Sequence, residues 1–254
     1  MCLILFAWKQ HPLYPLIIAA NRDEYFNRPT DPLRPWQDNP DIIAGRDLES
    51  QGTWLGISKK HRLAAVTNFR EPGFQMETPI SRGLLVSDFL ESSHTAPHYL
   101  QELEPQYPLY RGFNLLLWDG NGLYYSSNRH EQLLQLLPGI YGLSNHLLDT
   151  DWPKVVRGKT LLSQYIQQNN IQKDKLFNIL FDQTLPDEQS VPQTGLTSDW
   201  EKALSTIYID RDEYGTRAST IVLLNNNGDF SITEKSRNQL SEPLGTACYT
   251  YPTQ

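Results

Sequence analysis

The sequence predicts an α+β fold built from two antiparallel β-sheets with helices packed on their outer faces. Three observations support this prediction. Strand-like apolar runs dominate both ends of the chain, segments with helical periodicity fill its middle, and tight-turn sequences separate neighbouring strands. Asp119-Gly120-Asn121-Gly122 and Asn225-Asn226-Asn227-Gly228 are such turns, and each is typical of a β-hairpin. The pattern of elements alone leaves other α+β arrangements open.

The first part of the chain is predicted to form strands. Residues 3–8 and 16–20 are short apolar runs on either side of a polar turn, which predicts a buried hairpin. Prolines at positions 29, 32, 35 and 40 predict an extended loop over residues 27–40, because proline cannot continue a helix. Further strands are expected at residues 41–45, 53–58 and 63–68.

Helices and hairpins alternate through the rest of the chain. We expect Ser81 to cap the first helix and Asp151 to cap the third, with prolines in the first turns of the second and third. The predicted helices cover residues 81–90, 96–103, 152–168 and 173–181. The predicted strands cover residues 113–118, 123–127, 133–137, 140–144, 218–224 and 229–234.

Length and composition are those of an ordinary globular protein. The chain has 254 residues, of which 39% are hydrophobic and 20% charged, and we expect a single domain over residues 1–254. The formal net charge is −7, and lysine and arginine are not clustered. We therefore expect no nucleic-acid partner and no binding to an anionic membrane surface.

Cys2 and Cys248 lie at opposite ends of the chain and do not make a disulfide framework, which favours a reducing, cytoplasmic location. The apolar run at residues 3–8 has no basic residue before it and no cleavage site after it, and it is too short to span a bilayer. We interpret it as a buried strand and expect no membrane insertion.

Cys2 is the main candidate for chemistry. Removal of Met1 would place a thiol and a free α-amine on the same residue. The unperturbed pKa of such an amine is about 7.7–8.0 and that of a thiol about 8.5, so the amine can accept the thiol proton near neutral pH. The alternative is an inert cysteine buried in a strand, which is a common fate of this residue type.

Asn21-Arg22-Asp23-Glu24 is the second candidate, because it directly follows an apolar run and places opposite charges side by side. An arginine near a thiol stabilises the thiolate, and a carboxylate can hold an ammonium group. A salt-bridged strand terminus is the structural alternative. If the first two strands pair as a hairpin, this run and Cys2 lie at the same end of a sheet.

These two segments, together with blocks that follow them in order, resemble the NRDE family, also called transport and Golgi organisation protein 2. The resemblance covers nearly the whole chain. The blocks are Met1-Cys2-Leu3-Ile4, Ala20-Asn21-Arg22-Asp23-Glu24, Ala44-Gly45-Arg46-Asp47, Gly52-Thr53-Trp54-Leu55-Gly56, Ala65-Val66-Thr67-Asn68-Phe69-Arg70, Ser81-Arg82-Gly83-Leu84-Leu85, Tyr141-Gly142-Leu143-Ser144-Asn145, Trp152-Pro153-Lys154-Val155 and Tyr214-Gly215-Thr216-Arg217-Ala218-Ser219-Thr220.

The family is similar to N-terminal-nucleophile hydrolases such as penicillin V acylase and bile salt hydrolase, which cleave linear amides. The resemblance therefore implies a four-layer αββα sandwich of antiparallel sheets. By position, Cys2 matches the nucleophile, and Arg22 and Asp23 match the arginine and aspartate beside it. Asn145 matches an asparagine of the oxyanion hole, and Arg217 matches a late arginine near the nucleophile.

Four further residues complete the expected site. Asn68 is a second polar contact for the reaction, and Asn21, Glu24 and Trp54 are expected to contact the substrate. His94 and His98 have the i, i+4 spacing of helical metal ligands, but Pro97 lies between them and no clear third ligand follows. We therefore expect two surface histidines and no metal site.

Two functions follow from these observations. The first is a hydrolase or acyltransferase of linear amides that uses Cys2, exposed by Met1 removal, and needs no cofactor. The second is a non-catalytic carrier or chaperone for haem or another apolar small molecule, since the family is linked to haem mobilisation and to Golgi organisation. Either function implies a small-molecule partner, as substrate or cargo, and the oligomeric state stays open.

The chemistry also carries an expectation about the two thiols. Arg22 should lower the pKa of Cys2 by favouring the thiolate. Cys248 has no basic residue beside it in sequence, so in the processed chain we expect it to be far less reactive than Cys2.

Overall fold

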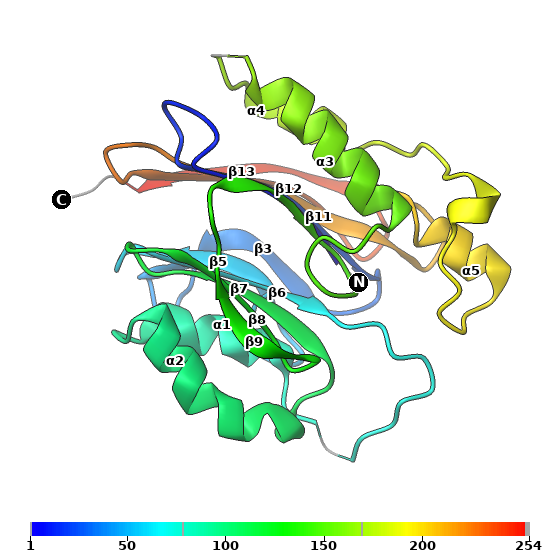
Figure 1. Cartoon of the computed structure of the whole chain (residues 1–254), viewed down its shortest axis with the longest axis horizontal. Coiled ribbons are helices and arrows are strands. Elements are labelled where there is room, and N and C mark those ends of the chain that lie inside the picture. Colours follow the sequence, from blue (N-terminus) through cyan, green and yellow to red (C-terminus); the bar gives the residue numbers. More distant parts are fainter. Residues whose placement is uncertain (1, 78, 169, 252–254) are drawn as a thin grey trace.

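Two antiparallel sheets lie face to face, and helices cover both outer faces (Figure 1). The structure is a computed structural model that describes residues 2–77, 79–168 and 170–251, with the backbone alone at residues 131 and 132. The predicted α+β fold, a four-layer αββα sandwich, is confirmed.

The first sheet places the start of the chain beside its late strands. In the described part of the chain it has six strands in the order β10-β1-β2-β11-β12-β13. The bounds are β1 Cys2–Trp8, β2 Leu16–Tyr25, β10 Gly139–Leu143, β11 Tyr214–Leu224, β12 Phe230–Arg237 and β13 Pro243–Tyr251. The pairing of β1 with β2 sets Cys2 directly opposite Arg22, as the predicted hairpin requires.

The second sheet follows the order of the sequence. Its seven strands in the described residues run from β3 to β9 without a crossover. The bounds are β3 Thr30–Pro35, β4 Ile42–Asp47, β5 Leu55–Ser58, β6 Arg62–Asn68, β7 Phe113–Trp118, β8 Leu123–Ser127 and β9 His130–Gln135.

Side-chain alternation along β1 divides the core into layers. Ile4, Phe6 and Trp8 pack between the two sheets, whereas Leu3 and Leu5 pack against the helices. Successive side chains of a strand point to opposite faces, so the phase of this strand directs Cys2 toward the second sheet. The thiol therefore lies at the end of the inter-sheet core and not under the helices.

The helices form the outer layers, with α3 and α4 on the first sheet and α1 and α2 on the second (Figure 1). The short helix α5 packs near the start of β11, where Trp200 lies edge-on to Tyr214. The bounds are α1 Arg82–Glu91, α2 Ala96–Leu103, α3 Pro153–Ile166, α4 Lys173–Leu180 and α5 Ser198–Ala203, with 3₁₀ turns at Glu104–Leu109 and Glu188–Ser190.

Several predicted boundaries differ from the structure. The proline-rich segment, expected as a loop, contains β3, which is an edge strand with an irregular pairing to β4, and edge strands tolerate proline. Trp152, not Asp151, is the N-cap of α3, and Ser81 is the N-cap of α1 but makes no side-chain cap hydrogen bond. Strand β13 and helix α5 have no counterpart among the predicted elements.

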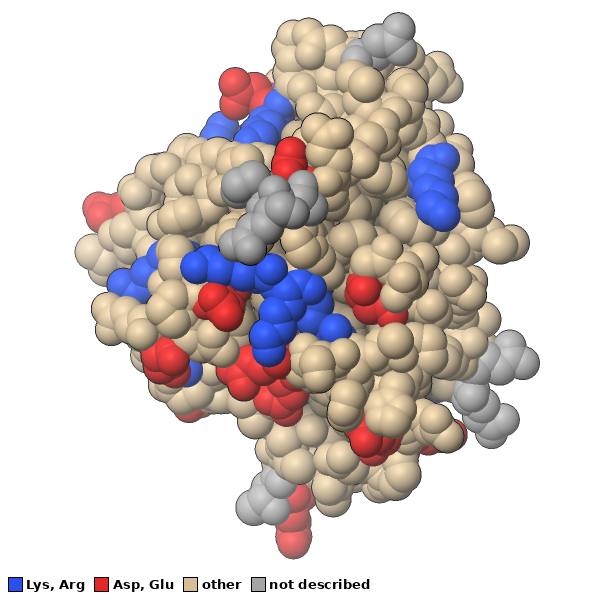
Figure 2. Space-filling model, turned by 90° about the vertical axis from the view of Figure 1, so that its left-hand side faces the viewer, with Lys and Arg blue, Asp and Glu red and all other residues tan. Residues whose placement is uncertain are grey.

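Two further observations concern the surface. Among the helices of the described residues, none is both long and apolar enough to cross a membrane. On the face in Figure 2, the main group of basic side chains has acidic side chains directly beside it, and other basic side chains lie apart from that group. The described part of this face therefore carries no broad area of a single charge sign.

Candidate active site

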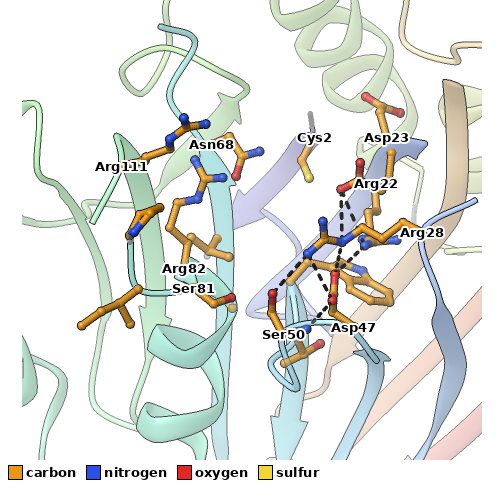
Figure 3. A pocket seen from close by; sticks show the side chains of 17 residues that line it. Cys2, Arg22, Asp23, Arg28, Asp47, Ser50, Asn68, Ser81, Arg82 and Arg111 are labelled. Atoms are coloured by element: carbon orange, nitrogen blue, oxygen red, sulfur yellow. Dashed lines mark hydrogen bonds and ion pairs between the residues drawn. The ribbon is translucent and has the colours of Figure 1, made fainter. Parts of the chain in front are cut away.

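A cavity of about 280 Å³ opens where β1 begins, between the two sheets and the start of α1. Figure 3 shows Cys2 between two walls: Arg22, Arg28 and Asp47 lie on one side, and Asn68, Arg82 and Arg111 lie on the other. Six of the predicted site residues line this cavity, namely Cys2, Arg22, Asp23, Glu24, Trp54 and Asn68.

Cys2 is half-buried at the first position of β1. Its carbonyl oxygen accepts a hydrogen bond from Ser144 Oγ at 3.0 Å, which fixes the backbone of the residue. Burial raises the pKa of the Cys2 thiol and outweighs the attraction of Arg22, while the charge of Asp23 raises it further. The charge of Arg22 acts in the expected direction, toward a lower pKa, but burial outweighs it, and the thiol needs a base to become a nucleophile.

Arg22 belongs to a partly buried cluster that is built around Asp47. Arg22 Nη2 lies 3.1 Å and Arg28 Nε 2.6 Å from Asp47 Oδ2, and both arginines lie within 3.9 Å of Glu24. Burial opposes ionisation of Asp47, but hydrogen bonds from Arg28 and from the Ser50 backbone keep its pKa below the usual value. The wall beside Cys2 is thus a fixed, nearly neutral set of charges.

The Trp54 ring packs against this cluster. The Arg22 guanidinium lies 4.3 Å from the centre of the Trp54 ring, a cation–π distance. Glycine at position 45 makes room for that ring, because a Cβ atom there would lie 2.2 Å from Trp54. Trp54 therefore orients Arg22 in addition to lining the cavity.

Asp23 lies at the end of β2 in a second buried group, on the helix side of the sheet. Its Oδ1 accepts a hydrogen bond from Thr216 Oγ1 at 2.7 Å, and its backbone oxygen accepts one from the Tyr214 hydroxyl. Burial raises the pKa of Asp23, and the positive charge of Lys154 acts against this rise.

Lys154, in the first turn of α3, is buried, and its Nζ has no hydrogen-bond partner among the described residues. Burial lowers the pKa of Lys154 to about 8, while Asp23 and Cys2 favour its charged form. Lys154 was not among the predicted site residues, although it belongs to one of the blocks that resemble the family.

Asn68 and Asn145 form a pair at the opposite wall. Asn145 is fully buried, and its Nδ2 donates to the Asn68 carbonyl at 2.9 Å. Its Oδ1 accepts from Ser144 Oγ, the hydroxyl that also contacts the backbone of Cys2. The side-chain amide of Asn68 lines the cavity and has no hydrogen-bond partner within the described chain. The side-chain amide of Asn68 is thus available to donate a hydrogen bond into the cavity, and Asn145 holds the Asn68 backbone in place.

Three predicted residues, Asn21, Arg217 and Asn145, do not fit the roles expected of them. Asn145, expected in the oxyanion hole, does not line the cavity, because its Nδ2 is bonded to the Asn68 carbonyl. Asn21, expected to contact substrate, points to the helix side, where Nδ2 donates to the carbonyls of Leu180 and Ile207. Arg217, expected near the nucleophile, donates from Nη1 to the carbonyls of Tyr25 and Arg28. The strand alternation explains the position of Asn21. An irregularity of β11 between Thr216 and Ala218 explains that of Arg217, because it turns Arg217 toward the loop that carries Arg28.

The sequence prediction missed the cationic wall formed by Arg82 and Arg111. Arg82 is the first residue of α1, and Arg111 precedes β7. Both line the cavity together with Ser81. The block Ser81-Arg82-Gly83 was a signal for the first of them, but nothing in the local sequence connects Arg111 to Cys2.

His94, His98 and Glu102 come together on the surface, with ligand atoms within 4.8 Å of one another. Glu102 is the third donor that the sequence did not indicate. Its carboxylate lies 2.9 Å from His94 Nδ1 and 3.2 Å from His98 Nε2, so it pairs with both rings. All three residues are exposed, and the expected absence of a metal site stays a prediction.

The surroundings of the Cys248 thiol differ from what its neighbours in the sequence suggest. It is exposed on β13, where Thr233 Oγ1 lies 3.2 Å and Lys173 Nζ 3.5 Å from its sulfur. The hydrogen bond from Thr233 and the charge of Lys173 lower the pKa of Cys248. The sequence-based reason for expecting a low reactivity of Cys248 therefore does not hold, because a cation from α4 lies beside its sulfur in space.

Comparison with known proteins assigns the chain to a family and identifies a solved structure with a similar fold. The sequence model described as Transport and Golgi organisation 2 matches residues 1–239. The chain belongs to the Transport and Golgi organisation 2 family. The mouse member is 36% identical and the human member 35% identical over 257 aligned residues, and each alignment covers 93% of both chains.

A solved structure extends this result to the fold. The N-acylethanolamine-hydrolyzing acid amidase orthologue of Caenorhabditis elegans superposes with a TM-score of 0.53 at 10% identity, covering 87% of this chain and 92% of that one. The Transport and Golgi organisation 2 family member described here therefore shares the sandwich fold of that amidase.

Proposed function

We propose that this family member is an amide hydrolase or acyltransferase in which Cys2, once it is the first residue, is the nucleophile. The observation that carries the proposal is the position of the Cys2 thiol in this cavity, opposite the uncommitted amide of Asn68 (Figure 3). The fold shared with an amidase supports it.

The reaction would proceed in two halves. The α-amine of Cys2 accepts the thiol proton, and the sulfur attacks the amide carbonyl to form a tetrahedral intermediate. Collapse breaks the C–N bond, the leaving amine takes the proton from the α-ammonium group, and a thioester remains on Cys2. A water, or an acceptor nucleophile in acyl transfer, gives its proton to the amine and attacks the thioester, which releases the acyl product and restores the thiol.

The surrounding residues would divide the remaining tasks. Asn68 Nδ2 would donate to the oxyanion, held in position by Asn145. Asp23 would hold the α-ammonium group by a charge-assisted hydrogen bond. Because burial raises the pKa of the Cys2 thiol, an unprocessed chain with no free amine at Cys2 would be inactive.

The carrier hypothesis requires a different kind of cavity. Most of the residues that line the cavity at Cys2 are charged or bear a hydroxyl or amide group, which does not suit haem or another apolar cargo. The family name indicates a role in transport and Golgi organisation, and a hydrolase acting in the cytoplasm is compatible with it. The polar lining favours the enzyme.

The test is hydrolysis of a panel of N-octanoyl amides by the processed chain. We expect Cys2→Ala to abolish release of octanoate. Asn68→Ala should lower kcat by about 10²–10³ with little change in KM, as expected for a lost oxyanion donor. Asn121→Ala, in an exposed turn, is the matched control and should keep full activity. Unchanged kcat in the Asn68 variant would remove the oxyanion role, and activity in the Cys2 variant would refute the proposal.

A further inference from the structure

The cavity contains more positive charge than its own carboxylates neutralise. Four arginines and three acidic residues line it, although the chain as a whole has a net charge of −7. On the wall beside Cys2, Arg22 and Arg28 are paired with Asp47 and Glu24. The excess charge is therefore on the other wall.

Arg82 and Arg111 form that wall, and neither makes an ion pair within the described residues. Arg82 Nη1 donates to the Gly112 carbonyl at 3.2 Å, and Arg111 Nη2 donates to the Phe74 carbonyl at 3.3 Å. Each guanidinium thus keeps further N–H groups for another partner. Burial, and secondarily the like charge of the neighbouring Arg111 on the same wall, lower the pKa of Arg82.

The packing of α1 fixes the position of Arg82 on this wall. The start of α1 packs directly on the segment before β5, where Thr53 N–H donates to the Gly83 carbonyl. A Cβ atom at Gly52 would lie 2.4 Å from the backbone of Gly83, so this close approach requires glycine. It brings Arg82 over the cavity together with the N-cap residue Ser81, whose side chain makes no cap hydrogen bond.

We propose that Arg82 and Arg111 bind an oxyanion group of the substrate, a carboxylate or a phosphate, that lies a few bonds from the scissile amide. Two guanidinium groups with free N–H donors and no acidic partner match such a group. Their place across the cavity from Cys2 sets the group close to the reacting carbonyl (Figure 3). The substrate class is that of acylated amino acids or acylated amino phosphates. This inference rests on the proposed function for the identity of the bond cleaved.

Binding can be measured without turnover in the Cys2→Ala protein. Calorimetric titration would compare N-octanoylglycine, its uncharged isostere N-octanoylglycinamide, and N-octanoyl-O-phosphoethanolamine. We expect an anionic probe to bind at least about tenfold more tightly than the glycinamide, as charge-assisted hydrogen bonds require. Tighter binding of the glycine compound assigns a carboxylate, and tighter binding of the phosphate compound assigns a phosphate.

The arginine variants test which residues are responsible. The preference for the anion should fall in steps in Arg82→Gln, Arg111→Gln and the double variant. The control Arg157→Gln removes an arginine of α3 that is paired with Asp182, and it should keep the preference. Arg111 is exposed, so its variant should fold normally even if the Arg82 variant does not. Equal binding of charged and neutral probes, or a preference retained in the Arg111 and double variants, would overturn the inference. An inactive enzyme that still prefers the anion would refute only the proposed function.

Discussion

The surroundings of the two sulfur atoms predict that Cys248 is the more reactive thiol while Cys2 lacks a free α-amine. Burial raises the pKa of Cys2, whereas Thr233 and Lys173 lower the pKa of exposed Cys248. In a chain that retains a residue before Cys2, we expect iodoacetamide to label Cys248 faster near neutral pH, because only the thiolate reacts. Peptide mass spectrometry of both cysteines over a pH series measures this order. Faster labelling of Cys2 in that unprocessed form would show that burial does not control its thiol.

Asp47 is the residue on which the arginine cluster depends. It is 13% exposed and pairs with Arg22 and Arg28, so Asp47→Asn leaves two arginines without their shared acceptor. We expect this change to lower the free energy of unfolding by about 2–3 kcal/mol, measured by urea denaturation. Because the pKa of Asp47 lies below its ordinary value of 3.8, its stabilisation is present above that pH and is lost as the pH falls through the folded value.

The matched control for Asp47 is Asp38→Asn. Asp38 pairs with Arg46 at 2.6 Å but is mostly exposed, so its loss should leave the urea midpoint nearly unchanged. Equal effects of the two substitutions would contradict the view that the Asp47 cluster is a structural centre of the site.

At the scale of elements, the first turn of α3 brings a buried cation to the end of β2. The pKa of Lys154 falls from 10.5 to about 8, so the folded chain releases this proton at lower pH than the unfolded chain. The resulting contribution to stability is fully present above pH 10.5, the pKa of Lys154 in the unfolded chain, and it is lost as the pH falls toward 8. The free energy of unfolding of the wild-type chain should therefore rise relative to Lys154→Met by up to ~3 kcal/mol between pH 8 and 10.5.

Urea denaturation at several pH values in this window tests the α3 prediction. Lys159→Met is the control, since Lys159 lies on the same helix but is paired with Asp149 and partly exposed. We expect the control to follow the wild-type pH dependence. Parallel curves for wild type and Lys154→Met would mean that Lys154 keeps its proton in the folded chain throughout this range.

Strand geometry also explains which parts of the site the sequence could predict. The hairpin of β1 and β2 was predictable from two apolar runs, and it alone brings Cys2 to Arg22. The polar run after residue 20 was expected to follow the second strand, but β2 continues through it to Tyr25. Alternation then sends Asn21 and Arg22 to opposite faces, which is why only one of these two neighbours reaches the cavity.

At the scale of the whole molecule, the sequence predicted the layers but not the complete cavity. Periodicity of 2 and of 3.6 residues indicates which face of an element is buried, and this sufficed for the sandwich. Asp47, Arg82 and Arg111 reach the cavity from three separate segments, and only the packing of both sheets and α1 brings them to Cys2. The surroundings of Cys248 were missed for the same reason, because Lys173 approaches it from another layer.

The central claim is that Cys2 acts as a nucleophile only when it carries the free α-amine. The most direct measurement is intact-mass spectrometry of Cys248→Ser protein after brief exposure to p-nitrophenyl octanoate, comparing the chain that begins at Cys2 with one that retains a residue before it. The Cys248 substitution is needed because that exposed thiol would also react. We predict one octanoyl adduct, mapped to Cys2, on the processed chain and little on the extended one. Equal acylation of both forms, or an adduct elsewhere than Cys2, would contradict the account.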